Sequence, residues 1–200
     1  MPLDRDVHAF DERAPRYERG WLGRLHHDIA DRTADLAMAR APEARRILDV
    51  GCGSGYLVRR LAQRLPDGVD LVGIDPAPGM VRAARAGVAD DRRVRFDSGF
   101  AEDLPYPDGS FDLIVSTTSF DHWADQGAGL AECARVLAPG GHLVLTDLIS
   151  PWLLPTLVAG HRGRARTVRR ASRLLSTAGF GSLRWHRLYR LILRTVTATR

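Results

Sequence analysis

The sequence contains no lysine, so arginine alone carries its positive charge. The 200 residues include 29 basic and 24 acidic side chains, which gives a net charge of +5. The excess is uneven, because six arginines fall between Arg162 and Arg173 with no acidic residue among them. Such a cluster indicates either a solvated helix face or a site for phosphate or another anion.

Cysteine is scarce as well. Cys52 and Cys133 are too few for a disulfide framework, and neither belongs to a CxxC pair or a metal-ligand cluster. We therefore expect no metal site, and a reducing cytoplasm is the simplest setting for the protein.

No apolar run approaches the roughly 18 residues that a membrane span needs, so none is expected. The charged residues 1–6 precede no apolar stretch, and a signal peptide is not expected. We found no internal repeat and no low-complexity segment. The length favours one domain over residues 1–200 with a single α/β core.

Short β-branched runs recur at even intervals and predict strands, with helical patterns between them. Leu57 and Leu61 share one helical face, and Leu130 and Cys133 share another; Pro139-Gly140-Gly141 is expected to end the second helix. Alternation of strands and helices predicts a Rossmann-like, doubly wound, mostly parallel sheet with helices on both faces. The predicted strands of this middle part are 46–50, 70–74, 94–96, 111–116 and 142–146.

The two ends differ from this middle part. Residues 4–40 predict one or two helices, whereas 183–189 and 191–198 predict two final strands with an uncertain boundary. Together the runs give seven strands, the last one antiparallel.

A glycine-rich turn follows the first predicted strand and leads directly into a helix. Glycines 51, 53 and 55 permit unusual backbone angles and close approach of a ligand to the helix amino terminus. Asp75 ends the next strand, 20 positions beyond Gly55, where a carboxylate can accept both ribose hydroxyls of an adenosine cofactor.

Two features separate a dinucleotide from S-adenosylmethionine (SAM) as that cofactor. The spacing here is GxGxG, not the dinucleotide GxGxxG, and Tyr56 occupies the position of the third glycine. Asp49 lies just before the loop, where a carboxylate would repel a pyrophosphate but help to hold the ammonium of an amino-acid tail. The balance favours SAM.

Several motifs resemble one family in its order and spacing. DVGCGSG and GIDPAPGM, then AEDLPYPDGSFD and RVLAPGG, resemble class I SAM-dependent methyltransferases, particularly the ubiquinone/menaquinone-biosynthesis-like (Methyltransf_11-type) subgroup. The opening FDERAPRY is similar to that subgroup's amino-terminal motif. The resemblance covers roughly residues 8–148 and implies methyl transfer from SAM to a small-molecule acceptor.

The resemblance also implies roles for individual residues. The glycine loop would surround the methionine part, Asp75 the ribose, and neighbouring residues the adenine, while Tyr17 would close over the cofactor. One departure is Phe100, where many relatives carry an acidic residue that accepts from the adenine amine. The expected cofactor-binding residues are Tyr17, Asp49, Gly51, Cys52, Gly53, Gly55, Asp75, Pro76, Met80, Ala101, Glu102 and Ser116.

By the same resemblance, the acceptor is expected near the segment after the fourth strand, where Asp121 and His122 are titratable groups at the edge at which open α/β sheets bind ligands. His122 is a candidate general base, because its ordinary pKa lies near neutrality, or else a capping or pocket-lining residue. Trp123 is either pocket wall or a stacking contact. His26 is a further catalytic candidate on the amino-terminal helix, where helical geometry lets at most one of His26 and His27 face the pocket.

The resemblance also implies that the stretch after the fifth strand borders the acceptor pocket. The apolar residues 150–158 would then form an acceptor wall that suits a quinone, phenol, polyketide or lipid, or else a helix packed on its own domain. We accordingly divide the chain into a helical lid (1–40), a cofactor-binding core (45–148) and an acceptor-side helix with final strands (149–200). Two other functions stay open: a SAM-binding regulatory or pseudo-enzyme protein, and a nicotinamide-dependent oxidoreductase. Nucleic acid ranks below a small-molecule partner, because no nucleic-acid-binding module is visible. The sequence assigns neither the acceptor atom nor the oligomeric state.

Overall fold

The computed structural model of the protein describes residues 7–8, 10–12, 14, 17–18, 20–88, 91–149, 167–189 and 193–200. The apolar segment 150–158 and the first half of the arginine cluster lie outside the described residues. No helix in the described ranges is both long and apolar enough to cross a membrane.

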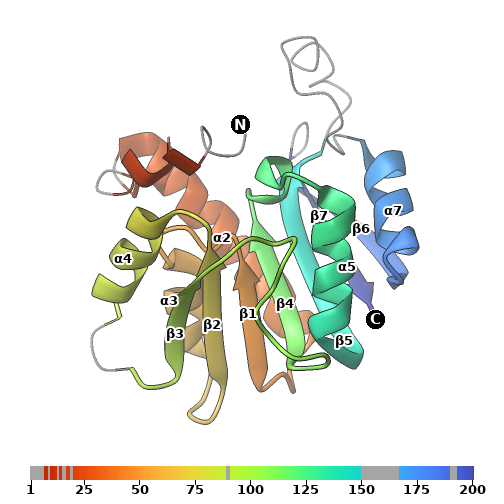
Figure 1. The fold of residues 1–200 in the computed structure, drawn as a ribbon, viewed down its shortest axis with the longest axis horizontal. Helices are drawn as coiled ribbons and strands as arrows, with labels where there is room; N and C mark the ends of the chain where they lie inside the picture. Colours follow the sequence, from red (N-terminus) through yellow and green to blue (C-terminus); the bar gives the residue numbers. More distant parts are fainter. Residues whose placement is uncertain are drawn as a thin grey trace.

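A seven-stranded sheet forms the centre of the molecule, in the order β3-β2-β1-β4-β5-β7-β6 (Figure 1). Strands β1 to β5 pair in parallel, and β7 runs antiparallel to both β5 and β6. The predicted Rossmann-like class is therefore confirmed, including the antiparallel last strand. The strands are β1 (Arg46–Val50), β2 (Asp70–Asp75), β3 (Val94–Ser98), β4 (Phe111–Thr117), β5 (Leu137–Leu148), β6 (Gly181–Tyr189) and β7 (Leu193–Thr199).

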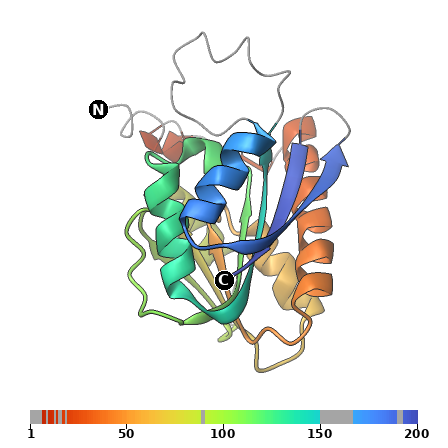
Figure 2. The ribbon, with the colours of Figure 1, turned by 90° about the vertical axis from the view of Figure 1, so that its right-hand side faces the viewer.

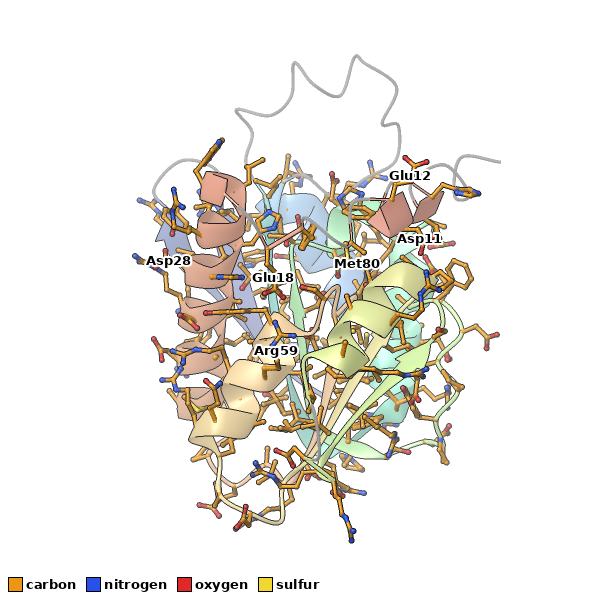
Figure 3. The ribbon with its side chains drawn as sticks, turned by 90° about the vertical axis from the view of Figure 1, so that its left-hand side faces the viewer. Asp11, Glu12, Glu18, Asp28, Arg59 and Met80 are labelled. Carbon is orange, nitrogen blue, oxygen red and sulfur yellow. The ribbon has the colours of Figure 1, made fainter. Side chains whose placement is uncertain are left out.

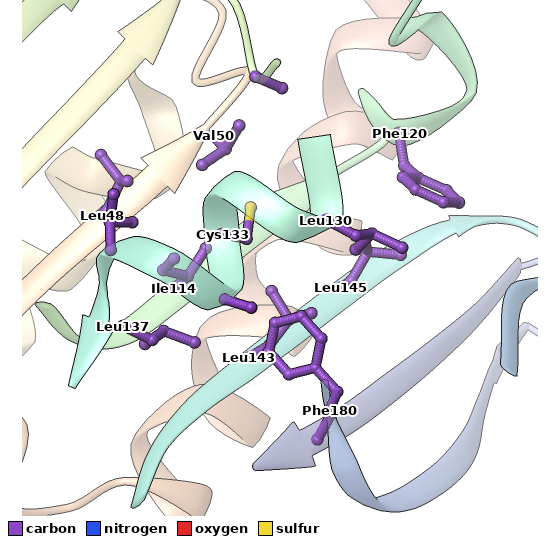
Figure 4. Packing of buried hydrophobic residues seen from close by; sticks show 14 of the residues in the cluster. Leu48, Val50, Ile114, Phe120, Leu130, Cys133, Leu137, Leu143, Leu145 and Phe180 are labelled. Carbon is purple, nitrogen blue, oxygen red and sulfur yellow. The ribbon is translucent and has the colours of Figure 1, made fainter. Parts of the chain in front are cut away.

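Helices cover both faces of the sheet (Figure 2). One face carries α2 (Gly20–Arg40), α3 (Tyr56–Arg64) and α4 (Pro78–Ala86), and the other carries α5 (Gln126–Val136) and α7 (Val168–Thr177). Alternation along the strands supplies a core to each side. In β1, Ile47 packs with the α2–α3 side, whereas Leu48 and Val50 join the larger cluster under α5 (Figure 4).

One sequence expectation is wrong at the α5–β5 junction. Pro139-Gly140-Gly141 does not separate the helix from the strand, because α5 already ends at Val136 and Leu137 pairs with Phe111. The register shifts between Phe111 and Leu113, so the Pro-Gly-Gly residues form an irregularity within β5. The completely buried Leu137 side chain explains the early start, since it must leave the helix to enter the core.

The parallel strands all end at one edge of the sheet, and the chain turns there into its most irregular segments. The glycine loop follows β1, Pro76 follows β2, and a 3₁₀ turn, η2 (Phe120–His122), follows β4. Open α/β sheets place their ligands at this edge, where the connections diverge to opposite faces.

Candidate active site

Backbone hydrogen bonds join the glycine loop to the neighbouring strand β2. The N–H groups of Gly51 and Cys52 both donate to the carbonyl of Ile74, over 2.8 and 3.0 Å. Gly51 has φ of +74°, and a Cβ there would overlap the side chain of Ser119. Glycine is therefore needed at position 51 both for the backbone angle and for the close approach of η2.

Gly55 lies on the side of the loop that packs against α4 and β3. It caps α3 with φ of +80°, and a Cβ there would lie 2.7 Å from Phe96 and 2.9 Å from Ala84. It lines neither of the cavities described below, although the sequence places it among the cofactor-binding glycines. Its position instead lets the start of α3 pack closely on α4 and β3.

Asp75 is buried at the end of β2 and is already well bonded. One carboxylate oxygen accepts from the N–H of Gly53 and the other from the N–H of Ala77, each over 2.9 Å. Burial raises its pKa, although both N–H donors act in the opposite direction. Asp75 therefore ties the glycine loop to the turn after β2 and lines the cavity between them.

Asp49 presents the opposite situation. Its side chain is 1% exposed, and neither carboxylate oxygen has a hydrogen-bond partner. Burial first, and the charge of Asp75 second, raise its pKa to about 8. Asp49 shares a strand face with Ile47, so it points toward the α2–α3 side beneath the loop. A buried carboxylate without a partner fits a cationic ligand group such as the ammonium of SAM.

The larger cavity at this edge measures about 790 Å³, part of it open to solvent. Its walls are mainly apolar and come from the amino-terminal segment, the turns after β2 and β3, and the segment after β4. Nine of the predicted cofactor-binding and catalytic residues line it: Tyr17, Gly51, Gly53, Asp75, Pro76, Met80, Ala101, Glu102 and His122.

A second cavity of about 450 Å³ lies between α2 and the start of α3. Its polar walls include Glu18, Ser54, Tyr56 and both histidines of α2, whereas helical geometry predicted at most one histidine. Cys52 also lines this cavity. The two cavities meet at five shared residues, namely Tyr17, Gly51, Gly53, Thr117 and Thr118.

The amino-terminal segment is hydrogen-bonded to the core through Asp11 and Glu18, two contacts that the sequence did not predict. Asp11 accepts a hydrogen bond from the N–H of Gly79 at the start of α4. Glu18 accepts from Ser54 Oγ over 2.7 Å and from Arg59 Nη2 over 2.6 Å (Figure 3). Because Arg59 of α3 binds Glu18, the adjacent Tyr17 is kept where the two cavities meet.

The η2 turn brings His122 to the larger cavity. The His122 ring packs edge-on against Phe10, with ring centroids 5.0 Å apart. Asp147, buried at the end of β5, accepts from the N–H of Asp121 over 3.2 Å. Burial raises the pKa of Asp147 to about 6. Asp147 went unnoticed in the sequence because one acidic residue in a strand resembles any other.

Three further predicted residues have structural partners. Asp121 lines neither cavity and contributes its backbone to the bond just described. Ser116 is completely buried and is 2.8 Å from Ser119 Oγ, which donates to the carbonyl of Val50. Trp123 forms part of the larger cavity wall, packs edge-on against Phe120 and donates through Nε1 to Ser119 over 3.3 Å.

Comparison with known proteins agrees with this architecture. The family described as "Methyltransferase domain" matches residues 48–145, which include the glycine loop, Asp75 and η2. The chain therefore carries a domain of the class I SAM-dependent methyltransferases, whose cofactor is S-adenosylmethionine. Within that class it belongs to the ubiquinone/menaquinone-biosynthesis-like type.

The curated relatives differ in what they methylate. A demethylmenaquinone methyltransferase from Thermus thermophilus is 43% identical over 148 residues, covering 71% of this chain and 65% of that protein. A second, from Deinococcus radiodurans, is 44% identical over 69% of this chain and 58% of its own length. A 27-O-demethylrifamycin SV methyltransferase from Amycolatopsis mediterranei is 35% identical over 80% of this chain and 63% of its own length. The chain thus spans less than two thirds of each of these relatives.

Solved structures share the fold at low sequence identity. A complex between the Haloferax volcanii Trm112 methyltransferase activator and a methyltransferase matches with a TM-score of 0.79 and 22% identity, covering 95% of this chain and 96% of the other. The [4+2]-cyclase SpnF matches with a TM-score of 0.70 and 23% identity, covering 85% of this chain and 80% of the other. A cyclase among these matches means that the fold alone does not fix the reaction.

Proposed function

We propose that the protein transfers the methyl group of SAM to a small, uncharged, hydrophobic or aromatic acceptor. The observation that carries this proposal is the unpaired, buried carboxylate of Asp49 behind a glycine loop that opens into two joined cavities. A cationic amino-acid group would compensate this carboxylate, whereas the pyrophosphate of a nicotinamide dinucleotide would be repelled by its ionised form and would give it no charge partner.

The residues around the larger cavity would hold the nucleoside. Asp75 keeps lone pairs free beside its two backbone bonds and would accept from the ribose hydroxyls, while Pro76 and Met80 would pack on the adenine. Ala101 and Glu102 line the same end of the cavity, although Glu102 Oε1 also accepts from the N–H of Asp125 over 3.0 Å.

When bound, SAM supplies an electrophilic methyl group on its sulfonium sulfur. The chain's contribution is to hold the acceptor in line and to keep water out, which the amino-terminal segment does through Phe10 and Tyr17. His122 lies in the same wall and would take the proton of a hydroxyl acceptor. An acceptor carbon activated by its own ring would need less help from a base.

The larger cavity also supports an acceptor class. Val7, Phe10 and Trp123 give it an apolar wall, and no arginine is among its described lining residues. Among these described residues, a carboxylate or phosphate on the acceptor would therefore find no arginine to pair with. Together with the demethylmenaquinone methyltransferase relatives, this supports a quinol or phenol as the first acceptor to test.

The first experiment is calorimetric titration with S-adenosylhomocysteine, the demethylated product, beside NADH and NADPH. We expect micromolar binding of S-adenosylhomocysteine alone. Labelled SAM is then offered with a panel containing a naphthoquinol, a hydroxylated polyketide and a carboxylate-bearing phenol, and transfer to the uncharged compounds is expected.

Other results would favour the alternatives. Binding of a nicotinamide cofactor would replace the proposal with an oxidoreductase on the same sheet. Tight binding of S-adenosylhomocysteine without transfer to any compound of the panel would favour a regulatory protein or pseudo-enzyme.

A further inference from the structure

We propose that His26 binds the carboxylate of the cofactor's amino-acid tail in the second cavity, and so selects the cofactor without taking part in the chemistry of transfer. This inference rests on the proposed function. It assigns the polar cavity between α2 and α3 to the tail, and it gives His26 a different task from the catalytic one suggested by its sequence position.

We infer that the cofactor occupies both cavities, with its nucleoside in the larger one and its amino-acid tail in the second. Asp75, Met80 and Ala101 line only the larger cavity, which fits the nucleoside. The cavities join across Gly51 and Gly53, so a ligand that crosses the loop places its other end among the polar walls of the second cavity. An amino-acid tail carries one positive and one negative group, and both need partners there.

The positive group has a partner of its own. Asp49 lies beneath the loop on the α2–α3 side, and its two unbonded oxygens fit an ammonium. The negative group cannot use most of the loop. The N–H groups of Gly51 and Cys52 already donate to Ile74, that of Gly53 to Asp75 and that of Gly55 to Cys52.

His26 offers what the loop does not. Its Nδ1 atom is buried without a hydrogen-bond partner, and its ring lies 5.1 Å from the ring of Tyr17, where the cavities meet. The first turn of α3, with Tyr56 and Leu57, lines the opposite wall and adds the positive end of a helix dipole. A carboxylate between α2 and α3 would thus meet a ring nitrogen on one side and a helix amino terminus on the other.

His27, the neighbouring residue, is the matched control. Its ring stacks on Tyr56 with centroids 3.7 Å apart, and its Nε2 lies 3.7 Å from the Glu18 carboxylate. These contacts give His27 a packing task between α2 and α3.

The test compares two ligands that differ only by the tail. S-adenosylhomocysteine carries it, whereas 5′-methylthioadenosine keeps the nucleoside and the sulfur but has no amino-acid group. Calorimetry on the whole chain measures both affinities for the unaltered protein and for His26→Ala, His26→Asn and His27→Ala. We expect His26→Ala to weaken S-adenosylhomocysteine by about tenfold or more, the effect of one charge-assisted hydrogen bond, while methylthioadenosine changes less than about twofold.

The control variants sharpen this result. His26→Asn retains a donor close to the Nδ1 position and should recover part of the lost affinity, whereas His27→Ala should change both ligands alike. Equal losses for both ligands in His26→Ala would overturn the inference, because they would indicate a structural role. Unchanged affinities with a lower kcat would overturn it in favour of catalysis. Failure of the unaltered protein to bind either ligand would instead remove the proposed function itself.

Discussion

The two cavities differ in how completely their walls are bonded before any ligand arrives. Around the larger one, Asp75 is bonded at both oxygens. Around the smaller one, His26 Nδ1 is buried without a hydrogen-bond partner, and so are both carboxylate oxygens of Asp49 beneath the glycine loop. The larger cavity is thus shaped mainly by the fold, whereas the smaller one leaves polar groups for a ligand to satisfy.

The two aspartates illustrate this difference. Both are buried near the ends of adjacent parallel strands, where Asp75 is the last residue of β2 and Asp49 the last but one of β1. Asp75 stabilises the loop whether or not a ligand is bound. Asp49 opposes folding when it is ionised, since its charge is buried and uncompensated. Substitution of Asp75 should therefore lower both the stability of the protein and its affinity for the ligand. Substitution of Asp49 should raise the stability of the free protein and lower the affinity.

The largest effect is expected for Asp75→Ala. The substitution removes the proposed ribose acceptor and frees the N–H groups of Gly53 and Ala77, so affinity for S-adenosylhomocysteine should fall by about a hundredfold or more. The far-UV circular dichroism spectrum should stay that of a folded protein. Calorimetry measures the affinity, and binding that stays as tight as in the unaltered protein would contradict the ribose assignment.

Asp49→Asn should separate stability from binding. Because folding raises the pKa of Asp49 from 3.8 to about 8, its contribution favours the folded state at low pH and is lost as the pH rises toward 8. Removing the acid should raise Tm of the free protein by about 2–4 °C at pH 8, with little change at pH 4. Affinity for S-adenosylhomocysteine should fall about tenfold.

Thermal unfolding between pH 4 and 8, with and without ligand, checks both parts. Lower stability of Asp49→Asn across this range would mean that the carboxylate has partners in the free protein. The comparison between the two cavities would then fail.

His122→Ala tests the larger cavity on the acceptor side. With a hydroxyl acceptor, kcat should fall by roughly a hundredfold, which is typical of a lost general base, while affinity for S-adenosylhomocysteine changes less than about twofold. A matched loss of cofactor affinity would place His122 against the nucleoside. With a carbon acceptor, the same variant should lose less.

The smallest effect concerns the fastened amino-terminal segment. Glu18→Gln weakens the bonds to Ser54 and Arg59, and since these groups are partly exposed, the dissociation rate of S-adenosylhomocysteine should rise only about two- to threefold. Glu12, an exposed glutamate of the same segment, provides the control substitution Glu12→Gln. Stopped-flow displacement measures both rates, and equal rates in the two variants would show that Glu18 does not control release.

The sequence predicted the sheet well because its signals are local. The buried strands are predicted by short apolar runs rich in β-branched residues. The glycine loop and Asp75 are predicted by the spacing between them along the chain. The site was only partly predictable, because its remaining partners meet across long stretches of chain. Nothing local marks Glu18 as a partner of Arg59, or Asp147 as the acceptor beneath η2. Gly55 shows that a motif position can also carry a packing role, because a Cβ there would overlap Phe96 and Ala84; its predicted contact with the cofactor stays a prediction.

If Asp49 binds the cofactor's ammonium as proposed, cofactor binding should release a proton from its buried carboxyl group. With its pKa raised to about 8, the group carries a proton in much of the free protein at neutral pH. A bound ammonium would favour the ionised form, so that proton would pass to the buffer. The heat of binding should consequently vary with the ionisation enthalpy of the buffer, and apparent affinity should increase as the solution becomes mildly alkaline.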